Sequence, residues 1–455
     1  MSHRADPSPE RSVRATWSRS DRTLARIIQP LQSFLDTEAS GGALLLLAAV
    51  VALLWANSPW RGSYEALWAT TLRIDLGGLH VSEDLRHWVS DGLMALFFFV
   101  VGLEIKREVT TGELRSPRSV ALPAVAALGG MVVPAAIYLA LNAGGEGADG
   151  WGIPMATDIA FAVGVLTLAA RHAPSGLKPF LLTLAIVDDI GAILVIAIFY
   201  TADIDWAALG IAAGMVLITV ALQRSHVRLL PVYVALGAGV WLATFESGIH
   251  ATIAGVVLGL LTPSAPFQRP DAVSREAHRV ANETLDDPTP PDADAAQWLR
   301  LASLSRETVS PLARLESLLH PWTSFVVVPL FALANAGVYL SGGTLREALT
   351  SPISLGVILG LVVGKAVGIT GASWIATRTG VGALPAGVRW SQLAGAAIVA
   401  GIGFTVSLLV ADLAFGPGPR LDVAKAGVLV ASTLAGAAGY LVISRTTARG
   451  DESRR

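Results

Sequence analysis

The stretch that decides the fold is Leu184-Ala185-Ile186-Val187-Asp188-Asp189-Ile190-Gly191-Ala192. It lies in the middle of an apolar run over 177–200, which is long enough to cross a bilayer as a helix. At about 1.5 Å of rise per residue, both carboxylates lie roughly 16 Å from either end, too far for a side chain to reach water. A structural hydrogen-bonded pair is the alternative. Because acids in mid-membrane are costly, we expect this pair to be functional instead.

The composition of the whole chain agrees with a membrane protein. Of its 455 residues 53% are apolar and only 15% are charged, and the mean hydropathy is +0.58. Soluble domains carry roughly 25% charged residues, so the composition excludes a disordered chain and an ordinary cytosolic enzyme. The net charge of −2 argues against nucleic acid as a partner. The lack of cysteine excludes disulfides, cysteine-ligated metals and thiol catalysis.

Twelve stretches are apolar and long enough to span a bilayer, so the predicted fold class is an all-α polytopic membrane protein. The division between the seventh and eighth spans rests only on Glu246 and Ser247. The predicted spans are 40–57, 88–105, 120–142, 152–170, 177–200, 206–222, 229–245, 248–262, 322–340, 353–377, 390–413 and 421–443.

Most of the 33 Lys and Arg residues gather in the two tails and in alternate loops, which predicts that both termini are cytoplasmic. We expect a flexible N-terminal tail over 1–37 without a cleaved signal peptide, and a C-terminal tail over 446–455. Between them, 38–445 form the membrane domain. Its long cytoplasmic loop, 263–320, has a middle (286–292) that is typical of disorder. Within this loop, Arg300 to His320 are predicted to form a short helix docked on the membrane.

One predicted outer segment, 71–82, alternates apolar and polar residues around Gly77-Gly78, which indicates a β-hairpin. The hairpin would place Leu72, Ile74 and Leu76 on one face with Leu79 and Val81. It could form a dimer contact, or it could lie on the outer surface of its own chain. The residues alone favour neither reading.

Lys365 lies at the midpoint of the tenth span and is the one basic residue that the loop assignments leave in mid-membrane. A buried ammonium needs a carboxylate partner, and Asp188 or Asp189 is the natural choice. Such a pair could be a structural clamp, a protonatable carrier or both.

Two predicted spans are interrupted. Pro154 precedes Thr157 and Asp158 in the fourth span, and Gly401-Ile402-Gly403-Phe404-Thr405 interrupts the eleventh. Unwound backbone at membrane depth persists only where protein buries it or where it lines a cavity. Each interrupted span stands second in a group of three, which is the pattern of an inverted-repeat secondary transporter with its site at mid-membrane.

Other charges lie closer to the membrane surfaces. Asp91 is at the outer end of the second span, and His250 begins the eighth. Four further residues lie near the inner surface. They are either ordinary interfacial charges or a pH-responsive network, since histidine titrates near neutral pH. They are Glu104, Arg107, Glu316 and His320.

Several motifs together resemble those of the NhaA family of sodium/proton antiporters, over about residues 33–445 and in the same order. The motifs are Ala156-Thr157-Asp158-Ile159-Ala160-Phe161-Ala162, Ala185-Ile186-Val187-Asp188-Asp189-Ile190-Gly191-Ala192-Ile193, Val101-Gly102-Leu103-Glu104-Ile105-Lys106-Arg107-Glu108, His320-Pro321-Trp322 and Gly401-Ile402-Gly403-Phe404-Thr405.

The resemblance implies twelve helices with inverted repeats, the fourth and eleventh unwound and crossing. It implies a multi-pass protein of the bacterial plasma (inner) membrane that exports Na⁺ or Li⁺ for a larger number of protons. Such exchange is electrogenic, is regulated by pH and needs no cofactor. The 71–82 hairpin is similar to the homodimer contact of the family.

The resemblance also implies roles for individual residues. Asp189 would be the main carrier of cation and proton, with Asp188 beside it, and Lys365 would pair with Asp188 when no cation is bound. Thr157 and Asp158 would shape the charge balance at the crossed helices. The remaining roles are access from outside for Asp91 and the pH response for Glu104, Arg107, Glu316 and His320.

The sequence departs from the family pattern at Ser317, where the best-known member has histidine, and in the longer loop at 263–314. A K⁺/H⁺ exchanger remains an alternative, because carboxylates alone do not set ion selectivity. An intramembrane enzyme using Mg²⁺ and a diphosphate substrate is disfavoured, because no acid follows Asp189 within four residues and because the acidic pair lies in mid-span without a second such motif. A passive channel would not require the buried lysine.

Overall fold

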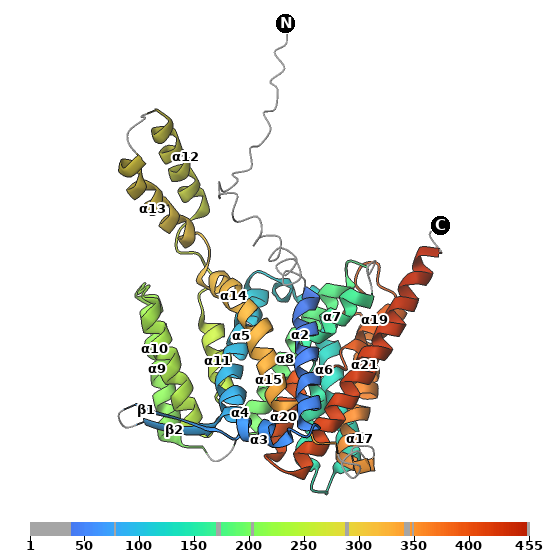
Figure 1. The fold of residues 1–455 in the computed structure, drawn as a ribbon. Helices are drawn as coiled ribbons and strands as arrows, with labels where there is room; N and C mark the ends of the chain where they lie inside the picture. Colours follow the sequence, from blue (N-terminus) through green and yellow to red (C-terminus); the bar gives the residue numbers. More distant parts are fainter. Residues whose placement is uncertain are drawn as a thin grey trace.

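The computed structural model describes residues 38–76, 79–169, 174–201, 204–286, 291–340, 346–347 and 350–452. The predicted tail over 1–37 lies outside these residues. Helices run side by side through the body of the molecule (Figure 1). A two-stranded sheet lies at one end of this bundle, and the helices of the 263–320 loop project from the other end.

Each predicted span falls on one helix or on two or three consecutive helical segments. The uninterrupted ones are α2 (Glu38–Ala56), α6 (Pro117–Asn142), α8 (Leu177–Phe199), α9 (Trp206–Arg224), α10 (Leu230–Glu246), α11 (Thr252–Leu261) and α21 (Pro419–Glu452). α21 therefore carries most of the predicted C-terminal tail, with 453–455 outside the described residues.

Three spans contain a π-helical segment, in which the hydrogen-bond ladder locally widens. They are α4 (Leu85–His87) with η1 (Trp88–Leu93) and α5 (Met94–Thr110), α14 (Pro311–Trp322) with η4 (Thr323–Val327) and α15 (Val328–Asn335), and α17 (Pro352–Leu359) with η5 (Gly360–Gly364) and α18 (Lys365–Arg378).

Two spans are broken. The 3₁₀ segment η3 (Ala148–Met155) meets α7 (Ile159–Ala169) at a bend of 42°, and α19 (Trp390–Val399) meets α20 (Phe404–Phe415) at 47°. Pro154 ends the first helical segment because it cannot donate a backbone hydrogen bond.

Among the described residues, seven helices are long and apolar enough to cross a membrane, or up to ten if each bent pair counts as one span. α10 and α11 are shorter apolar helices. The chain is therefore a multi-pass helical membrane protein.

Glycines bring α6 and α18 into close contact. A Cβ added at Gly129 would lie 2.3 Å from the Gly368 carbonyl oxygen, and one added at Gly368 would lie 2.2 Å from the Gly129 carbonyl oxygen. Backbone thus packs on backbone, as is common where small residues face each other between membrane helices. This contact lies one turn after Lys365 and fixes the depth of that side chain in the bundle.

The predicted hairpin is present. β1 (Thr71–Leu76) pairs antiparallel with β2 (Leu79–Asp84), and Ile74 faces Val81 in the register. The second strand runs two residues beyond the predicted end, because Asp84 then caps α4 by accepting the His87 N–H. Leu72 and Ile74 are exposed. Gly77 and Gly78 lie outside the described residues.

The long loop contains more helix than expected. α12 (Pro270–Asp286) and α13 (Pro291–Glu307) pack together. Most of the segment predicted to be disordered, 286–292, lies outside the described residues. The single helix predicted from Arg300 to His320 is wrong. α13 ends at Glu307, and α14 starts anew at Pro311, where the Ser310 hydroxyl accepts from the Ala313 N–H.

Candidate functional site

The two adjacent acids of α8 are fully enclosed. Asp188 has no exposed surface and Asp189 is 5% exposed. One carboxylate oxygen of each, Oδ1, has no hydrogen-bond partner among the described residues. A buried, unpaired carboxylate oxygen is costly and stays compatible with folding only if something satisfies it. A proton or a small cation bound to the carboxylate would do so.

Lys365 lies against the first of these acids. Its Nζ is 2.6 Å from Asp188 Oδ2, and neither side chain is exposed. The same ammonium donates to Thr157 Oγ1 at 3.0 Å. The π-helical turn η5 immediately precedes Lys365, and Gly364 lies close to the Pro134 backbone. The lysine therefore leaves α18 where the helix is locally widened and pressed against α6.

Asp188 and Asp189 point to different surroundings because successive residues of a helix are about 100° apart. Asp188 meets α18 through Lys365. Asp189 is next to this ion pair in the chain, but Lys365 donates its hydrogen bonds to Asp188 and Thr157 and none to Asp189 among the described residues. One acid is thus ion-paired, and its neighbour is left with an unpaired oxygen.

The two broken helices cross next to this ion pair. The Asp158 N–H donates to the Ile402 carbonyl at 2.6 Å, and the Thr157 hydroxyl donates to the Ala400 carbonyl at 2.8 Å. A Cβ at Gly403 would come within 2.9 Å of the Ala156 carbonyl oxygen, so only glycine fits there. The second break thus supplies backbone acceptors to the first.

Asp158 joins the two helix starts at the crossing. Its Oδ1 accepts from the Phe161 N–H in the first turn of α7, and its Oδ2 accepts from the backbone N–H and the hydroxyl of Thr405 in α20. Helix N-termini carry a partial positive charge and unsatisfied N–H groups. A single carboxylate therefore neutralises two helix ends that would otherwise repel each other.

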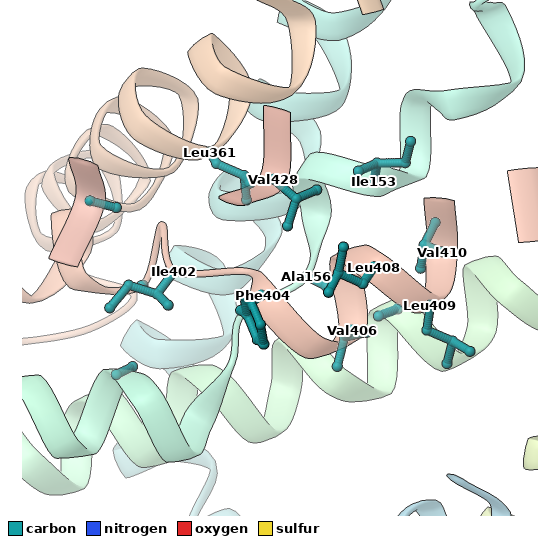
Figure 2. Packing of buried hydrophobic residues seen from close by; sticks show 14 of the residues in the cluster. Ile153, Ala156, Leu361, Ile402, Phe404, Val406, Leu408, Leu409, Val410 and Val428 are labelled. Atoms are coloured by element: carbon teal, nitrogen blue, oxygen red, sulfur yellow. The ribbon is translucent and has the colours of Figure 1, made fainter. Parts of the chain in front are cut away.

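An apolar shell surrounds the crossing. Figure 2 shows Ala156 of one broken span together with Ile402, Phe404 and Leu408 of the other, all members of one buried apolar cluster. The Phe404 ring also meets Phe161 edge-on, with centroids 5.8 Å apart. This shell keeps water from the polar groups of the breaks, which strengthens the electrostatic interactions inside it.

The charges expected near the inner surface come together only in part. Arg107 forms ion pairs with Glu316 and with Glu108. Glu104 lies on the same helix one turn earlier and is partly buried. His320 is exposed and forms no ion pair among the described residues. Its ring is therefore not part of the ion-paired group.

Asp91 and His250 lie away from the buried pair. Asp91 is partly buried in η1, where its carbonyl accepts from Trp241 Nε1. His250 contacts the Tyr200 carbonyl through Nε2.

Sequence reasoning missed several polar groups. It did not connect Thr405 to Asp158, or Ser407 to the Ile153 carbonyl, which accepts from the serine hydroxyl at 2.7 Å. It also overlooked Lys425. Lys425 lies inside α21 and is 4% exposed, so the described chain has a second buried lysine. Its position inside the predicted 421–443 span was the signal.

Fold and site together define a multi-pass membrane protein of the secondary-transporter class, with buried acids and a lysine at two crossing broken helices. A family model described as Na+/H+ antiporter 1 matches residues 32–443, and the chain belongs to that family. The members of this family are secondary transporters and not enzymes.

Curated relatives agree with the family model. The chain is 48% identical to Na(+)/H(+) antiporter NhaA 3 of Frankia alni, over 92% of this chain and 89% of the relative. It is 47% identical to NhaA 2 of Sorangium cellulosum, over 94% and 93%. It is also 47% identical to NhaA of Rhodopirellula baltica, over 91% and 93%.

Proposed function

We propose that this protein exports Na⁺ or Li⁺ in exchange for protons. Its curated relatives are named Na⁺/H⁺ antiporters, which supports exchange of Na⁺ for protons. The observation that carries the proposal is the enclosed group of Asp188, Asp189 and Lys365, with one ion pair and two unpaired carboxylate oxygens. Such a group can hold protons or a small cation, and the two compete for the same oxygens. No cofactor is needed for this chemistry.

In the proposed cycle, Na⁺ reaches the site from the cytoplasm and displaces the protons from Asp189 and its coupled partner. Cation binding to Asp188 releases Lys365 from its ion pair. The loaded site then turns outward, the cation leaves, protons return to the site, and Lys365 pairs with Asp188 again. Because more protons enter than cations leave, exchange is electrogenic.

Thr157 and Asp158 serve as supports in this scheme. Thr157 holds the Lys365 ammonium while Asp158 balances the two helix starts. The charge at the crossing therefore changes with the occupancy of Asp188 and Asp189 while the crossing itself stays intact.

We further propose twelve spans in two inverted repeats, with the helix pairs η3–α7 and α19–α20 as the unwound fourth and eleventh spans. One bundle would rock against the other about this crossing to give alternating access. The protein would lie in the bacterial inner membrane with both termini in the cytoplasm, as the distribution of Lys and Arg indicates. Residues 38–445 would form the antiporter domain, with 1–37 and 446–455 as cytoplasmic tails.

Two surface features would serve regulation and assembly. Glu104, Arg107, Glu316 and His320 are proposed to adjust activity to pH at the cytoplasmic side, and Asp91 to lie at the outer access route. The exposed Leu72 and Ile74 of the hairpin would pair with the hairpin of a second copy.

The test is collapse of a preformed pH gradient by Na⁺ in inside-out membrane vesicles. Addition of Na⁺ or Li⁺ should collapse the gradient, and K⁺ should not. Asp189→Asn should reduce the Na⁺ response at least a hundredfold, because an amide cannot exchange a proton for a cation. Asp271→Asn, a change at an exposed cytoplasmic acid, should leave it unchanged. Full exchange by Asp189→Asn would contradict the carrier role.

Lys365→Ala separates two roles for the lysine. If Lys365 carries a proton, the variant should exchange Na⁺ without moving net charge across the membrane. The measurement is the Na⁺ response with the membrane potential clamped at different values. Electrogenic exchange in Lys365→Ala would make the lysine a structural partner of Asp188.

A further inference from the structure

A second buried lysine lies outside the site described above. Lys425 is 4% exposed, and the contacts of its ammonium with polar side chains of the described residues are long, 3.4 Å to Asn335 Oδ1 and 4.0 Å to Asp412 Oδ1. By contrast, Lys365 reaches its carboxylate at 2.6 Å. Burying a cation with distant partners is costly, so a role beyond packing is expected.

The Asn335 side chain extends this contact to a third helix. Its amide Nδ2 donates to Ser90 Oγ at 3.2 Å while its Oδ1 accepts from Lys425. The three side chains Lys425, Asn335 and Ser90, which we call the outer bridge, form a chain of hydrogen bonds from α21 through α15 to η1. All three residues are buried.

The outer bridge lies at the hairpin end of the molecule. Asn335 is the last residue of α15, and the carbonyls of Leu333 and Ala334 just before it accept from the Tyr64 hydroxyl. Tyr64 belongs to α3 (Arg61–Trp68), the short helix that leads into the hairpin. Figure 1 shows α3 and the strands at the same end of the bundle.

The outer bridge also joins two different groups of helices. α21 packs on α7 and α17, which belong to the spans that carry Thr157, Asp158 and Lys365, and on α19 and α20 of the other broken span. α15 packs mainly on α2, with smaller contacts to η1 and α20, and neither α2 nor α15 carries a site residue. Any rocking of one group against the other at the hairpin end must therefore stretch or break the hydrogen bonds of the outer bridge.

We propose that Lys425, through the outer bridge, is a positioning residue that closes the route from Asp189 to the hairpin face and releases it once in each transport cycle. This rests on the proposed exchange function. Long hydrogen bonds suit a contact that must open repeatedly. Asp412, whose side chain is 21% exposed, remains beside the ammonium as a partner when Asn335 moves away.

The experiment uses cysteine pairs, because the natural chain contains no cysteine. Val338 and Ala426 are buried and pack on each other beside the outer bridge, and replacing them leaves Lys425 and Asn335 in place. The double variant Val338→Cys/Ala426→Cys is cross-linked with a short bifunctional thiol reagent in proteoliposomes. Cross-linking should slow Na⁺-driven proton movement at least tenfold, and each single variant treated in the same way should be unaffected. Full exchange by the cross-linked protein would overturn the proposal.

A second measurement tests the proposal if the double cysteine variant does not fold. The single variant Val338→Cys should react with a membrane-impermeant maleimide several-fold faster during Na⁺ exchange than at rest. Adding Asn335→Leu should raise the resting rate, because the outer bridge is then broken. Equal labelling in all three conditions would overturn the proposal. Failure of exchange in the untreated wild-type protein would instead contradict the exchange function, and the resting labelling of the Asn335→Leu variant would still test the bridge.

Discussion

At the scale of single residues, the carboxylate of Asp158 holds the crossing together. It accepts hydrogen bonds from the first turns of both α7 and α20. Without it, two partly positive helix ends would face each other in a site that excludes water. Its first role is therefore structural, whereas the unpaired oxygens belong to Asp188 and Asp189.

This role predicts different effects for two substitutions. Asp158→Ala removes every acceptor and should lower the free energy of unfolding by about 1–3 kcal/mol for each donor left unsatisfied. Asp158→Asn keeps one acceptor oxygen and should cost less. Thermal denaturation in detergent measures both. Equal melting temperatures for the two variants would show that the helix ends do not depend on this side chain.

The sequence predicted only part of the buried ion pairing. The cost of a charge in the membrane singled out Lys365 and the two aspartates, and it left open which of the two the lysine meets. The direction of each side chain on α8 decides this, and it depends on how α8 packs against its neighbours. Lys425 was missed although it lies inside the predicted 421–443 span, because it stands only four residues from the end of that span, where the long side chain of a lysine ordinarily reaches the membrane surface.

At the scale of helices, the packing of α6 on α18 sets the position of Lys365. The two helices approach each other at Gly129 and Gly368, where a Cβ added to either residue would clash with the backbone of the other helix. Gly371 also lies on α18, and a Cβ added there would have no atom of another described helix within 4 Å. The pair Gly368 and Gly371 therefore separates the effect of close packing from that of helix propensity.

Gly368→Ala should destabilise the protein by about 1–3 kcal/mol, as overpacked sites do, and should reduce Na⁺ exchange by displacing Lys365. Gly371→Ala should be neutral or stabilising by up to about 1 kcal/mol, since alanine favours helix. Melting temperature and vesicle exchange are measured on both. If the two variants behaved alike, the close approach would have no part in placing the lysine.

Helix positions were largely predictable because a bilayer demands long apolar segments. The π-helical turns at η1, η4 and η5 were not, since they reflect contacts between helices that are distant in sequence. The break between α13 and α14 could have been found, because Ser310 before Pro311 is a helix-start signal.

At the scale of the whole molecule, the hairpin leaves two apolar side chains of its first strand exposed. Leu72 and Ile74 are 45% and 39% exposed, and a lone two-stranded sheet leaves its edges open. A second copy of the chain would cover this surface. Arg73 points to the opposite face of the same strand, since successive side chains alternate.

Leu72→Glu with Ile74→Glu should therefore shift the purified protein from dimer to monomer while Na⁺ exchange per chain is retained. Arg73→Ser should leave the dimer intact. Mass measurement by light scattering in detergent distinguishes the two forms. A dimer that survived both glutamates would assign the contact to another surface.

The central claim is that Na⁺ and protons compete for Asp188 and Asp189. The most direct measurement is proton release when Na⁺ is added to the purified protein in weakly buffered detergent solution, followed with a pH-sensitive dye. Proton release should saturate with Na⁺ and should be lost in Asp189→Asn. Saturable Na⁺ binding by the wild-type protein without any proton release would contradict the claim.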